Sequence, residues 1–310
     1  MAHKIVVMNY KGGVGKTVVT VNLAATLSSG RDRNRVLLID LDPQGNASSY
    51  CYKAKYDRTG EEDGDDGKHF GAFLKGDVSS LLDVALEYSY PQEIKKDPQD
   101  DRTPITKNMV YDEKLGTEIE KIYRWNAIPN FKIVPAYEDL GLELDIDSFN
   151  ADLDINILKN CLPSIEKDFD YILMDCPPSF NKLSQIALLA ADHTLIPVKP
   201  GPFEFAGLIA MLKKIASFER EFGHTLNKNV VMNMIRMGAP RHITFYQMFK
   251  DQLGDVMLNQ SIPLAEEITH SIGMNLPLAY SKKGNLKLEF EKLSRELVQI
   301  FDRAQEATHA

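Results

Sequence analysis

The chain has 310 residues, with 36 lysines and arginines against 44 aspartates and glutamates, which gives a formal net charge of -8. Apolar residues make up 44% of the chain and charged residues 26%, an ordinary balance for a globular protein with a sizeable core. The acidic balance argues against a histone-like or polybasic protein, although a local basic patch could still bind nucleic acid.

Cysteine usage and hydropathy exclude further classes. Cys51, Cys161 and Cys176 are widely spaced and form no CxxC pair, which is neither a disulfide framework nor a zinc or iron–sulfur pattern. No run approaches 18 consecutive apolar residues, so no membrane span is expected. The N-terminus lacks the basic region and cleavage site of a signal peptide, and we expect a cytoplasmic protein.

Short apolar runs alternate with segments of helical spacing along the chain. The runs are rich in Val and Ile without polar alternation, which is typical of strands buried on both faces of a parallel sheet. They predict strands at 5–8, 36–39, 131–134, 171–174, 194–198 and 230–234, and a weaker one at 256–258. Helices are predicted between them at 16–27, 154–165, 182–189, 205–222 and 245–253. This alternation predicts an α/β fold, with a mostly parallel central sheet flanked by helices on both faces.

The segment at about 50–123 departs from this rhythm, and we interpret it as an atypical polar insertion in a single domain spanning 1–310. Its polar runs at 60–67 and 95–102 predict exposed loops. Between them, residues 78–88 have helical spacing, with Asp77 as the expected N-cap.

The C-terminal segment 286–301 predicts an amphipathic helix. Its apolar stripe consists of Leu286, Phe290, Leu293, Leu297 and Ile300. Packing on the sheet is favoured over a membrane surface because the polar face mixes Glu with Lys instead of being basic.

A glycine-rich loop follows the first predicted strand. Residues 10–17 read Tyr-Lys-Gly-Gly-Val-Gly-Lys-Thr and lead into the first predicted helix. Glycines let successive N–H groups point inward, and the helix N-terminus adds partial positive charge, so the loop can cradle a β-phosphate. Lys16 can reach the terminal phosphates, and the Thr17 hydroxyl can ligate Mg²⁺. The residues expected to bind the nucleotide here are Gly12, Gly13, Val14, Gly15, Lys16, Thr17 and Val18.

Two residues depart from a standard phosphate loop. Tyr10 stands where such a loop has glycine, and Lys11 opens the glycine run. A second ammonium at its own triphosphate would be partly redundant with Lys16. Lys11 gains a distinct role if it reaches a neighbouring subunit's nucleotide and neutralises charge that develops on the transferred phosphoryl group.

Several stretches together carry a family resemblance. Lys-Gly-Gly-Val-Gly-Lys-Thr at 11–17 resembles the deviant Walker A loop of the ParA/MinD family, and Val-Leu-Leu-Ile-Asp-Leu-Asp-Pro-Gln-Gly-Asn at 36–46 resembles the second motif of its ParA/Soj branch. The segment 171–179 resembles the Walker B strand and switch II. Weaker matches lie at 195–199, 203–208, 230–234 and, more loosely, Ile262-Pro263 with Gly273. The resemblance implies a P-loop NTPase of the deviant Walker A type that uses ATP/ADP and Mg²⁺.

Acidic residues lie where predicted strands end. Asp40 and Asp175 each end a strand, and Asp42 follows Asp40 by two residues, so all three lie at the edge where open α/β sheets bind ligands. The resemblance implies that Asp42 orients the attacking water and that Asp40 and Asp175 belong to the magnesium shell. The segments 43–46 and 177–179 would then be switches that sense the γ-phosphate. A strand-ending turn with Pro43 is the structural alternative for Asp40 and Asp42.

The resemblance also implies contacts to the nucleotide from the C-terminal half. Asn233 lies at a predicted strand end, and its carboxamide can donate to and accept from an adenine edge, although a structural turn is the alternative. Pro263 is a second implied nucleotide-binding residue.

The family's cycle implies several partners. ATP would join two monomers face to face with each Lys11 in the partner's site, the homodimer would bind DNA without sequence preference, and a ParB-like protein would stimulate hydrolysis. The chain would thereby segregate a plasmid or chromosome, or position another cargo. Nucleoid association would follow from DNA binding.

The residues leave the DNA step open. Candidate DNA contacts are Arg236, Arg241, Lys282, Lys283, Lys287, Lys292 and Arg295. A solvated face is the structural alternative for them, since nine basic and nine acidic residues share 230–310. Ala265, Glu266 and Glu267 occupy the place where the ParA/Soj branch tends to have a DNA-contacting Arg. Two other functions remain open, a MinD-like membrane-surface ATPase and a biosynthetic P-loop relative.

Overall fold

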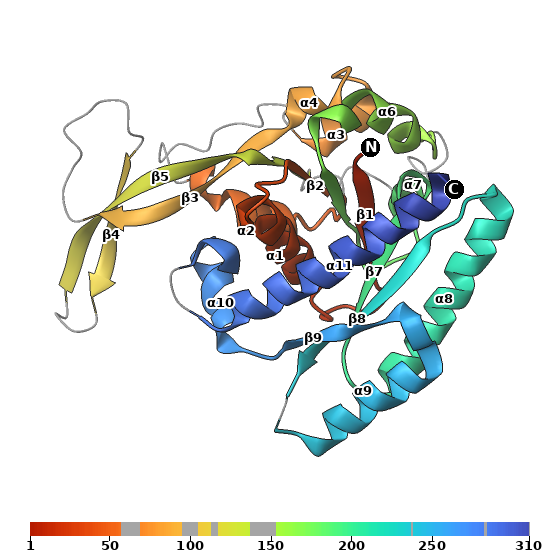
Figure 1. Cartoon of the computed structure of the whole chain (residues 1–310). Helices are drawn as coiled ribbons and strands as arrows, with labels where there is room; N and C mark the ends of the chain where they lie inside the picture. The colour runs from red at the N-terminus through yellow and green to blue at the C-terminus, as the bar shows by residue number, and fades with distance from the viewer. Residues whose placement is uncertain are drawn as a thin grey trace.

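A computed structural model describes residues 1–56, 69–94, 105–112, 117–136, 153–236, 238–281 and 284–309. The strands in this part of the chain form one nine-stranded sheet, in the order β3-β5-β2-β6-β1-β7-β8-β9, with β4 paired to β5 (Figure 1). The strands are β1 (His3–Val7), β2 (Val36–Asp40), β3 (Leu86–Ile94), β4 (Ile105–Asp112), β5 (Thr117–Val134), β6 (Tyr171–Asp175), β7 (His193–Val198), β8 (Asn227–Ile235) and β9 (Met257–Pro263). Along the sheet from β5 through β2, β6, β1, β7 and β8 to β9, each strand pairs in parallel with the next. This confirms the predicted mostly parallel sheet.

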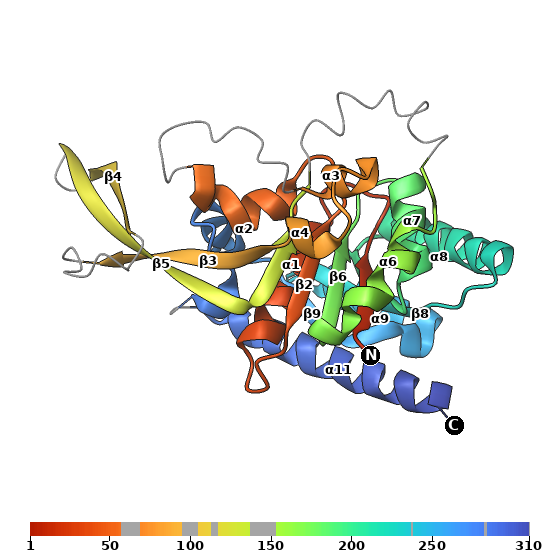
Figure 2. The ribbon, with the colours of Figure 1, turned by 90° about the horizontal axis from the view of Figure 1, so that it is seen from above.

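Helices cover both faces of this sheet. They are α1 (Lys16–Ser29), α2 (Asn46–Tyr56), α3 (Phe70–Lys75), α4 (Leu81–Val84), α6 (Ile157–Ile165), α7 (Lys182–Ala190), α8 (Pro202–Phe222), α9 (Pro240–Leu253), α10 (Glu266–Gly273) and α11 (Leu286–His309), with short 3₁₀ turns η2 (Glu166–Asp168), η3 (Gly254–Val256) and η4 (Leu278–Tyr280). In Figure 2, α11 lies on one side of the sheet and α7 on the other.

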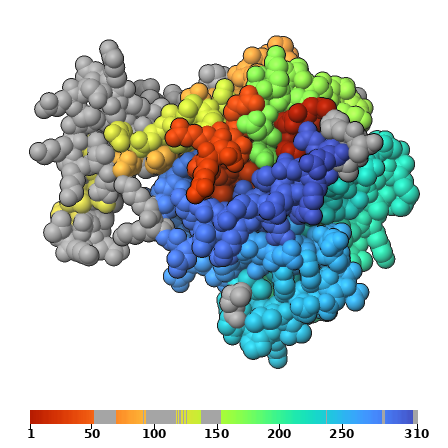
Figure 3. All heavy atoms as spheres, in the orientation of Figure 1, coloured from red at the N-terminus to blue at the C-terminus, as the bar shows by residue number. Residues whose placement is uncertain are grey.

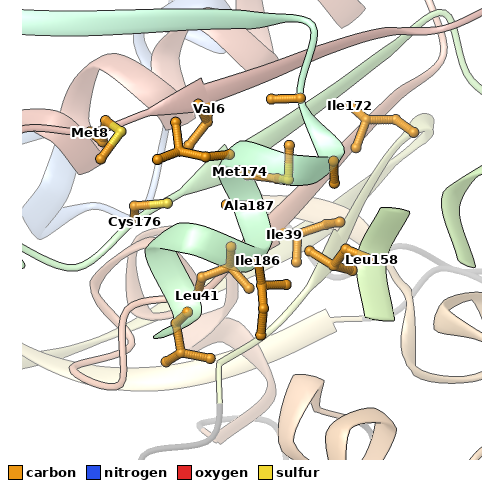
Figure 4. Close-up of a cluster of buried hydrophobic side chains, with 14 of the residues drawn as sticks. Val6, Met8, Ile39, Leu41, Leu158, Ile172, Met174, Cys176, Ile186 and Ala187 are labelled. Atoms are coloured by element: carbon orange, nitrogen blue, oxygen red, sulfur yellow. The ribbon is translucent and has the colours of Figure 1, made fainter. Parts of the chain in front are cut away.

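Alternate residues of the central strands feed two cores. In β2, Leu37 and Ile39 face the core that α6, α7 and α8 cover, whereas Val36 and Leu38 face the core that α1 and α11 cover. Figure 4 shows side chains of β1, β2 and β6 meeting those of α6 and α7 in the first of these cores. Burial on both faces explains why these strands read as continuous apolar runs.

The C-terminal helix packs on the sheet, as the sequence predicts. Leu286, Phe290, Leu293 and Leu297 of α11 are buried, and Phe301 is buried more fully than the predicted Ile300. Figure 3 shows this helix, in dark blue, lying across one face of the molecule. Among the described helices none is long and apolar enough to cross a membrane.

The prediction of a helix at 78–88 is wrong. α4 covers only Leu81–Val84, and its N-cap is Ser80 instead of Asp77. The Ser80 hydroxyl accepts from the Leu82 N–H at 3.2 Å, while the Asp83 carboxylate accepts from the Ser80 N–H at 3.0 Å, a capping box. From Leu86 the chain extends into β3, because pairing with β5 overrides the local helical spacing.

The segment at about 50–123 also contains more than loops and one helix. β3 and β4 both pair antiparallel with β5, which is far longer than the predicted strand at 131–134 and reaches back to Thr117. These three strands extend away from the helices as an arm (Figure 1). The polar runs at 60–67 and 95–102 lie outside the described residues.

Candidate active site

The glycine-rich loop joins β1 to α1 as predicted. Gly13 and Gly15 have φ angles of 67° and 84°, in the left-handed region that favours glycine. Gly15 is also the N-cap of α1 and provides no side-chain cap. The N–H groups of the first helical turn are therefore available to an anion at this end of α1.

Asn9 ties the start of the loop to the neighbouring strand. Its Nδ2 donates to the Pro197 carbonyl of β7 at 2.7 Å, and its Oδ1 accepts from the Lys11 N–H at 3.0 Å. Asn9 is buried, so its hydrogen bond to Pro197 is shielded from water. Sequence reasoning missed this residue because its partner lies 188 positions away.

Asp175 and Thr17 lie in contact, as the predicted magnesium site requires. Asp175 ends β6 fully buried, and its Oδ2 accepts from the Thr17 hydroxyl at 2.7 Å. Its Oδ1 accepts from the Thr20 hydroxyl at 2.8 Å, a contact that the sequence did not predict. Thr20 follows Thr17 by three residues on α1, and this helical spacing was the available signal.

Asp40 lies beside Asp175 at the ends of paired strands. The two residues are in register between β2 and β6, and both are fully buried. Asp40 Oδ2 accepts from the Ser48 N–H at 2.8 Å and from its hydroxyl at 2.7 Å, and Oδ1 accepts from the Asp42 N–H at 3.1 Å. Burial raises the pKa of both carboxyl groups, and the charge of Asp175 raises that of Asp40 further.

This donor set fits Mg²⁺. Two carboxylates and the Thr17 hydroxyl offer the oxygen ligands that the ion prefers. Among the described residues, no group of three or more His, Cys, Asp or Glu side chains could hold a metal alone. Mg²⁺ usually keeps several waters and takes further oxygens from a phosphate.

Lys16 and Asp42 lie close together at the carboxyl edge of the sheet. The Lys16 side chain is buried, which lowers its pKa, while the nearby charges of Asp175 and Asp42 oppose this shift. Asp42 forms a turn after β2, in which its Oδ1 accepts from the Gln44 N–H at 3.1 Å and its carbonyl accepts from the Gly45 N–H at 2.8 Å. Asp42 thus both forms the strand-ending turn and lies near Lys16. Its role in orienting the attacking water stays a prediction.

Lys11 lies against its own chain in this structure. Its Nζ is 3.4 Å from Oε1 of Glu204, in the first turn of α8. The reach of Lys11 into a partner's site stays a prediction. Glu204 was not predicted as a site residue, although the segment 203–208 carried part of the family resemblance.

Tyr10 packs against the second predicted switch. Its ring meets that of Phe180 edge-on, with centroids 5.8 Å apart, and Phe180 follows the segment 177–179 directly. Burial raises the pKa of the Tyr10 phenol above its usual range. The ring thus places apolar bulk against the residue that follows this segment, where a glycine would leave none.

Asn233 and Pro263 lie at the same edge of the sheet as the loop. Asn233 Nδ2 donates to the Val14 carbonyl at 2.8 Å, and its Oδ1 accepts from the Met234 N–H at 2.9 Å. A Cβ at Gly15 would collide with this amide, so Asn233 also restricts position 15 to glycine. Pro263 ends β9, paired with Ile235 of β8. The adenine contacts of both residues stay predictions.

Comparison with known proteins identifies the chain at the level of a family. A family model described as an AAA domain, AAA_31, matches residues 2–232. The chain belongs to this family. The resemblance of its motifs to ParA/Soj-type deviant Walker A ATPases is confirmed, because curated relatives of that type match this AAA protein over most of its length.

Two such relatives illustrate the match. The sporulation initiation inhibitor protein Soj of Bacillus subtilis (strain 168) is 26% identical over 279 residues, which cover 87% of this AAA protein and 89% of Soj. The chromosome partitioning protein ParA of Myxococcus xanthus (strain DK1622) is 28% identical over 269 residues, which cover 84% and 77% of the two chains.

Solved structures share the fold of this AAA protein. A plasmid partition protein of Borrelia burgdorferi B31 bound to AMPPNP has a TM-score of 0.68 at 20% identity, with 96% and 99% of the two chains covered. Cobyrinic acid a,c-diamide synthase of Mycobacterium smegmatis, with a bound ATP analogue and magnesium, has a TM-score of 0.66 at 18% identity, with 97% and 96% covered. The ligands of these proteins agree with the ATP/ADP and Mg²⁺ that the motifs predict for this P-loop ATPase family.

The candidate DNA contacts of this AAA protein divide into two groups. Arg236 and Arg241 are exposed near the carboxyl edge of the sheet, around the start of α9. On α11, Lys292 pairs with Glu289 at 2.8 Å, Lys287 donates to the Ala279 carbonyl at 2.8 Å, and Arg295 donates to the Glu291 carbonyl at 3.2 Å. Lys282 and Lys283 lie outside the described residues.

Proposed function

We propose that the protein is a partition or positioning ATPase that hydrolyses ATP at the loop 11–17. The observation that carries the proposal is the contact between Thr17 and Asp175, with Asp40 beside it. This contact brings the magnesium-binding hydroxyl of the loop to the carboxylates at the ends of β6 and β2. A glycine-rich turn without phosphate chemistry has no need of buried acids at this point.

In this function the chain's own residues divide the chemistry. The N–H groups of 13–17 hold the β-phosphate, and Lys16 neutralises the terminal phosphates from its buried position. Thr17, Asp40 and Asp175 would hold Mg²⁺, which when bound offsets phosphate charge. Asp42, whose backbone is fixed by Asp40 and by the turn to Gly45, orients the attacking water.

The proposed cycle requires Lys11 to move. ATP joins two copies face to face, and each Lys11 leaves Glu204 to contact the nucleotide of the partner. The ion pair is partly exposed, with 38% of the Lys11 side chain and 25% of the Glu204 side chain accessible, so its loss costs little. A phosphoryl group that develops charge between the two subunits offers a stronger partner.

The dimer would bind DNA without sequence preference, in the cytoplasm and on the nucleoid. A ParB-like protein would stimulate hydrolysis and release, so that a plasmid, a chromosome or another cargo is segregated or positioned. The names of the Soj and ParA relatives support this reading, and exposed Arg236 and Arg241 offer positive charge at one edge. If the protein instead bound a membrane surface through α11, the apolar stripe that this helix packs on the sheet would have to leave the core. The fold shared with cobyrinic acid a,c-diamide synthase keeps a biosynthetic ATPase as the second candidate.

Binding to random-sequence duplex DNA tests the proposal. The protein is titrated with no nucleotide, with ADP and with ATP across a salt series, and Lys16→Ala serves as the nucleotide-binding control. Binding that needs ATP and weakens with salt supports a partition function. ATP hydrolysis without DNA binding in any state would favour the biosynthetic alternative, and unchanged ATP affinity in Lys16→Ala would overturn the nucleotide site itself.

A further inference from the structure

A third lysine lies next to the phosphate loop. Lys199 directly follows β7, which pairs in parallel with β1, the strand that leads into the loop. A Cβ added at Gly13 would lie 3.9 Å from Nζ of Lys199. Lys199 therefore brings its ammonium to the glycine-rich side of the loop from a different strand.

The local backbone fixes this placement. Asn9 bonds to the carbonyl of Pro197, two residues before Lys199, and to the N–H of Lys11 within the loop. One buried side chain thus holds the end of β7 and the start of the loop at a set distance. The position of Lys199 relative to the loop follows from these bonds and from the pairing of β1 with β7.

Lys199 differs from the two other lysines in its interaction partners. Lys11 is paired with Glu204, and Lys16 lies buried near Asp175 and Asp42. Lys199 is half-buried, and within the described ranges it makes neither an ion pair nor a hydrogen bond. A partly buried cation without an acceptor, beside a loop whose N–H groups are available to an anion, suits a phosphate.

We infer that Lys199 is a further phosphate-binding residue of this site, which contacts the polyphosphate of the nucleotide held by its own chain's loop. The inference rests on the proposed function of that loop as a nucleotide site. Because Lys11 is engaged with Glu204, Lys199 supplies a free cation near Gly13 before any dimer forms. Lys199 thus acts in the monomer, whereas Lys11 acts across the dimer.

The test measures nucleotide affinity in a chain that does not dimerise. In a Lys11→Ala background, the affinities for ADP and for a fluorescent, non-hydrolysable ATP analogue are measured across a salt series for Lys199→Met, Lys199→Arg and the unaltered Lys199. Lys213→Met, on the exposed face of α8, is the matched control. Loss of one charge-assisted contact predicts about tenfold weaker binding in Lys199→Met, with a shallower salt dependence. Lys199→Arg and Lys213→Met should bind as the background does.

The outcomes separate this inference from the proposed function. Weaker binding of the ATP analogue alone, or of both nucleotides, supports the contact, and affinities within twofold of the background overturn it. If Lys199→Met does not fold, Lys199→Gln is judged by the same criterion. Absent nucleotide binding by the wild-type chain would instead defeat the nucleotide site, whereas binding that is lost in Lys16→Ala and unchanged in Lys199→Met would defeat only the role of Lys199.

Discussion

Nζ of Lys11 lies 3.4 Å from Oε1 of Glu204, so the lysine that opens the glycine run is held by the first turn of α8 in its own chain. A cation held in this way has to exchange one acceptor for another before it can reach a second subunit. In the proposed dimer, the carboxylate of Glu204 would therefore compete with the partner's nucleotide for Lys11.

Glu204→Gln should favour the ATP-dependent dimer. The change removes the competing charge, and because the ion pair is partly exposed we expect the dimer to form at about two- to fivefold lower protein concentration. Sedimentation velocity with a non-hydrolysable ATP analogue measures this midpoint. Glu221→Gln, on the exposed part of the same helix, should match the wild type, and Lys11→Ala should not dimerise. Identical midpoints for Glu204→Gln and the wild type would show that Glu204 does not restrain Lys11.

Asp42→Ala should trap the ATP-bound dimer. Asp42 holds no metal in the proposed site and lies near Lys16, so its removal should slow hydrolysis by about 100-fold or more while nucleotide binding persists. Phosphate release gives the rate, and light scattering gives the lifetime of the dimer. Asp255→Ala removes an exposed carboxylate elsewhere and should leave the rate unchanged. Hydrolysis by Asp42→Ala at the wild-type rate would assign the water to another residue.

Thr20→Val should destabilise the nucleotide-free protein. The substitution keeps the shape of the side chain but leaves Oδ1 of the buried Asp175 without its hydroxyl donor, at a cost of about 1–3 kcal/mol. Because this hydrogen bond lowers the pKa of Asp175, that pKa should rise further in the variant. Urea denaturation measures the free energy of unfolding. Thr26→Val is the control, since Thr26 donates only to the Asn22 carbonyl on the same helix, and an equal loss in both variants would contradict a special role for Thr20.

His193 should make the fold sensitive to acid. Its ring lies buried 4.2 Å from that of Phe301 on α11, and burial lowers its pKa to about 4. As the pH falls below about 6.5, the unfolded state takes up this proton before the folded state does, so stability is lost on acidification. Relative to His193→Leu, the wild type should lose about 2–3 kcal/mol between pH 6.5 and pH 4. Denaturation curves of both proteins at several pH values test this, and a constant difference between them would refute it.

The sequence predicts the centre of the fold well because its signals there are local. The strands that become β1, β2, β6, β7 and β8 are buried on both faces, so each reads as an apolar run whatever its neighbours are. The contact between Thr17 and Asp175 also follows from the sequence. One residue starts the helix after a strand and the other ends a parallel strand, and such ends meet at one edge.

The errors arise where distant segments decide the structure. Residues 86–88 end the segment 78–88 with predicted helical spacing, yet they begin β3 because β5 offers a partner strand, which no local window contains. The contact of Lys11 with Glu204 depends in the same way on how α8 packs beside the loop. Lys11 and Glu204 are 193 positions apart, and neither segment carries a sequence signal that predicts their contact.

The glycine-rich loop is restrained by side chains that reach three different strands of the sheet. Asn9 reaches β7, Asn233 reaches it from β8, and Thr17 bonds to the last residue of β6. A ligand therefore meets a loop that is already ordered, and its binding energy is not reduced by the entropy of shaping the backbone. Rapid association with little backbone rearrangement at the loop should follow. In the proposed cycle, the structural response to nucleotide would then come from Lys11 and from the two predicted switch segments.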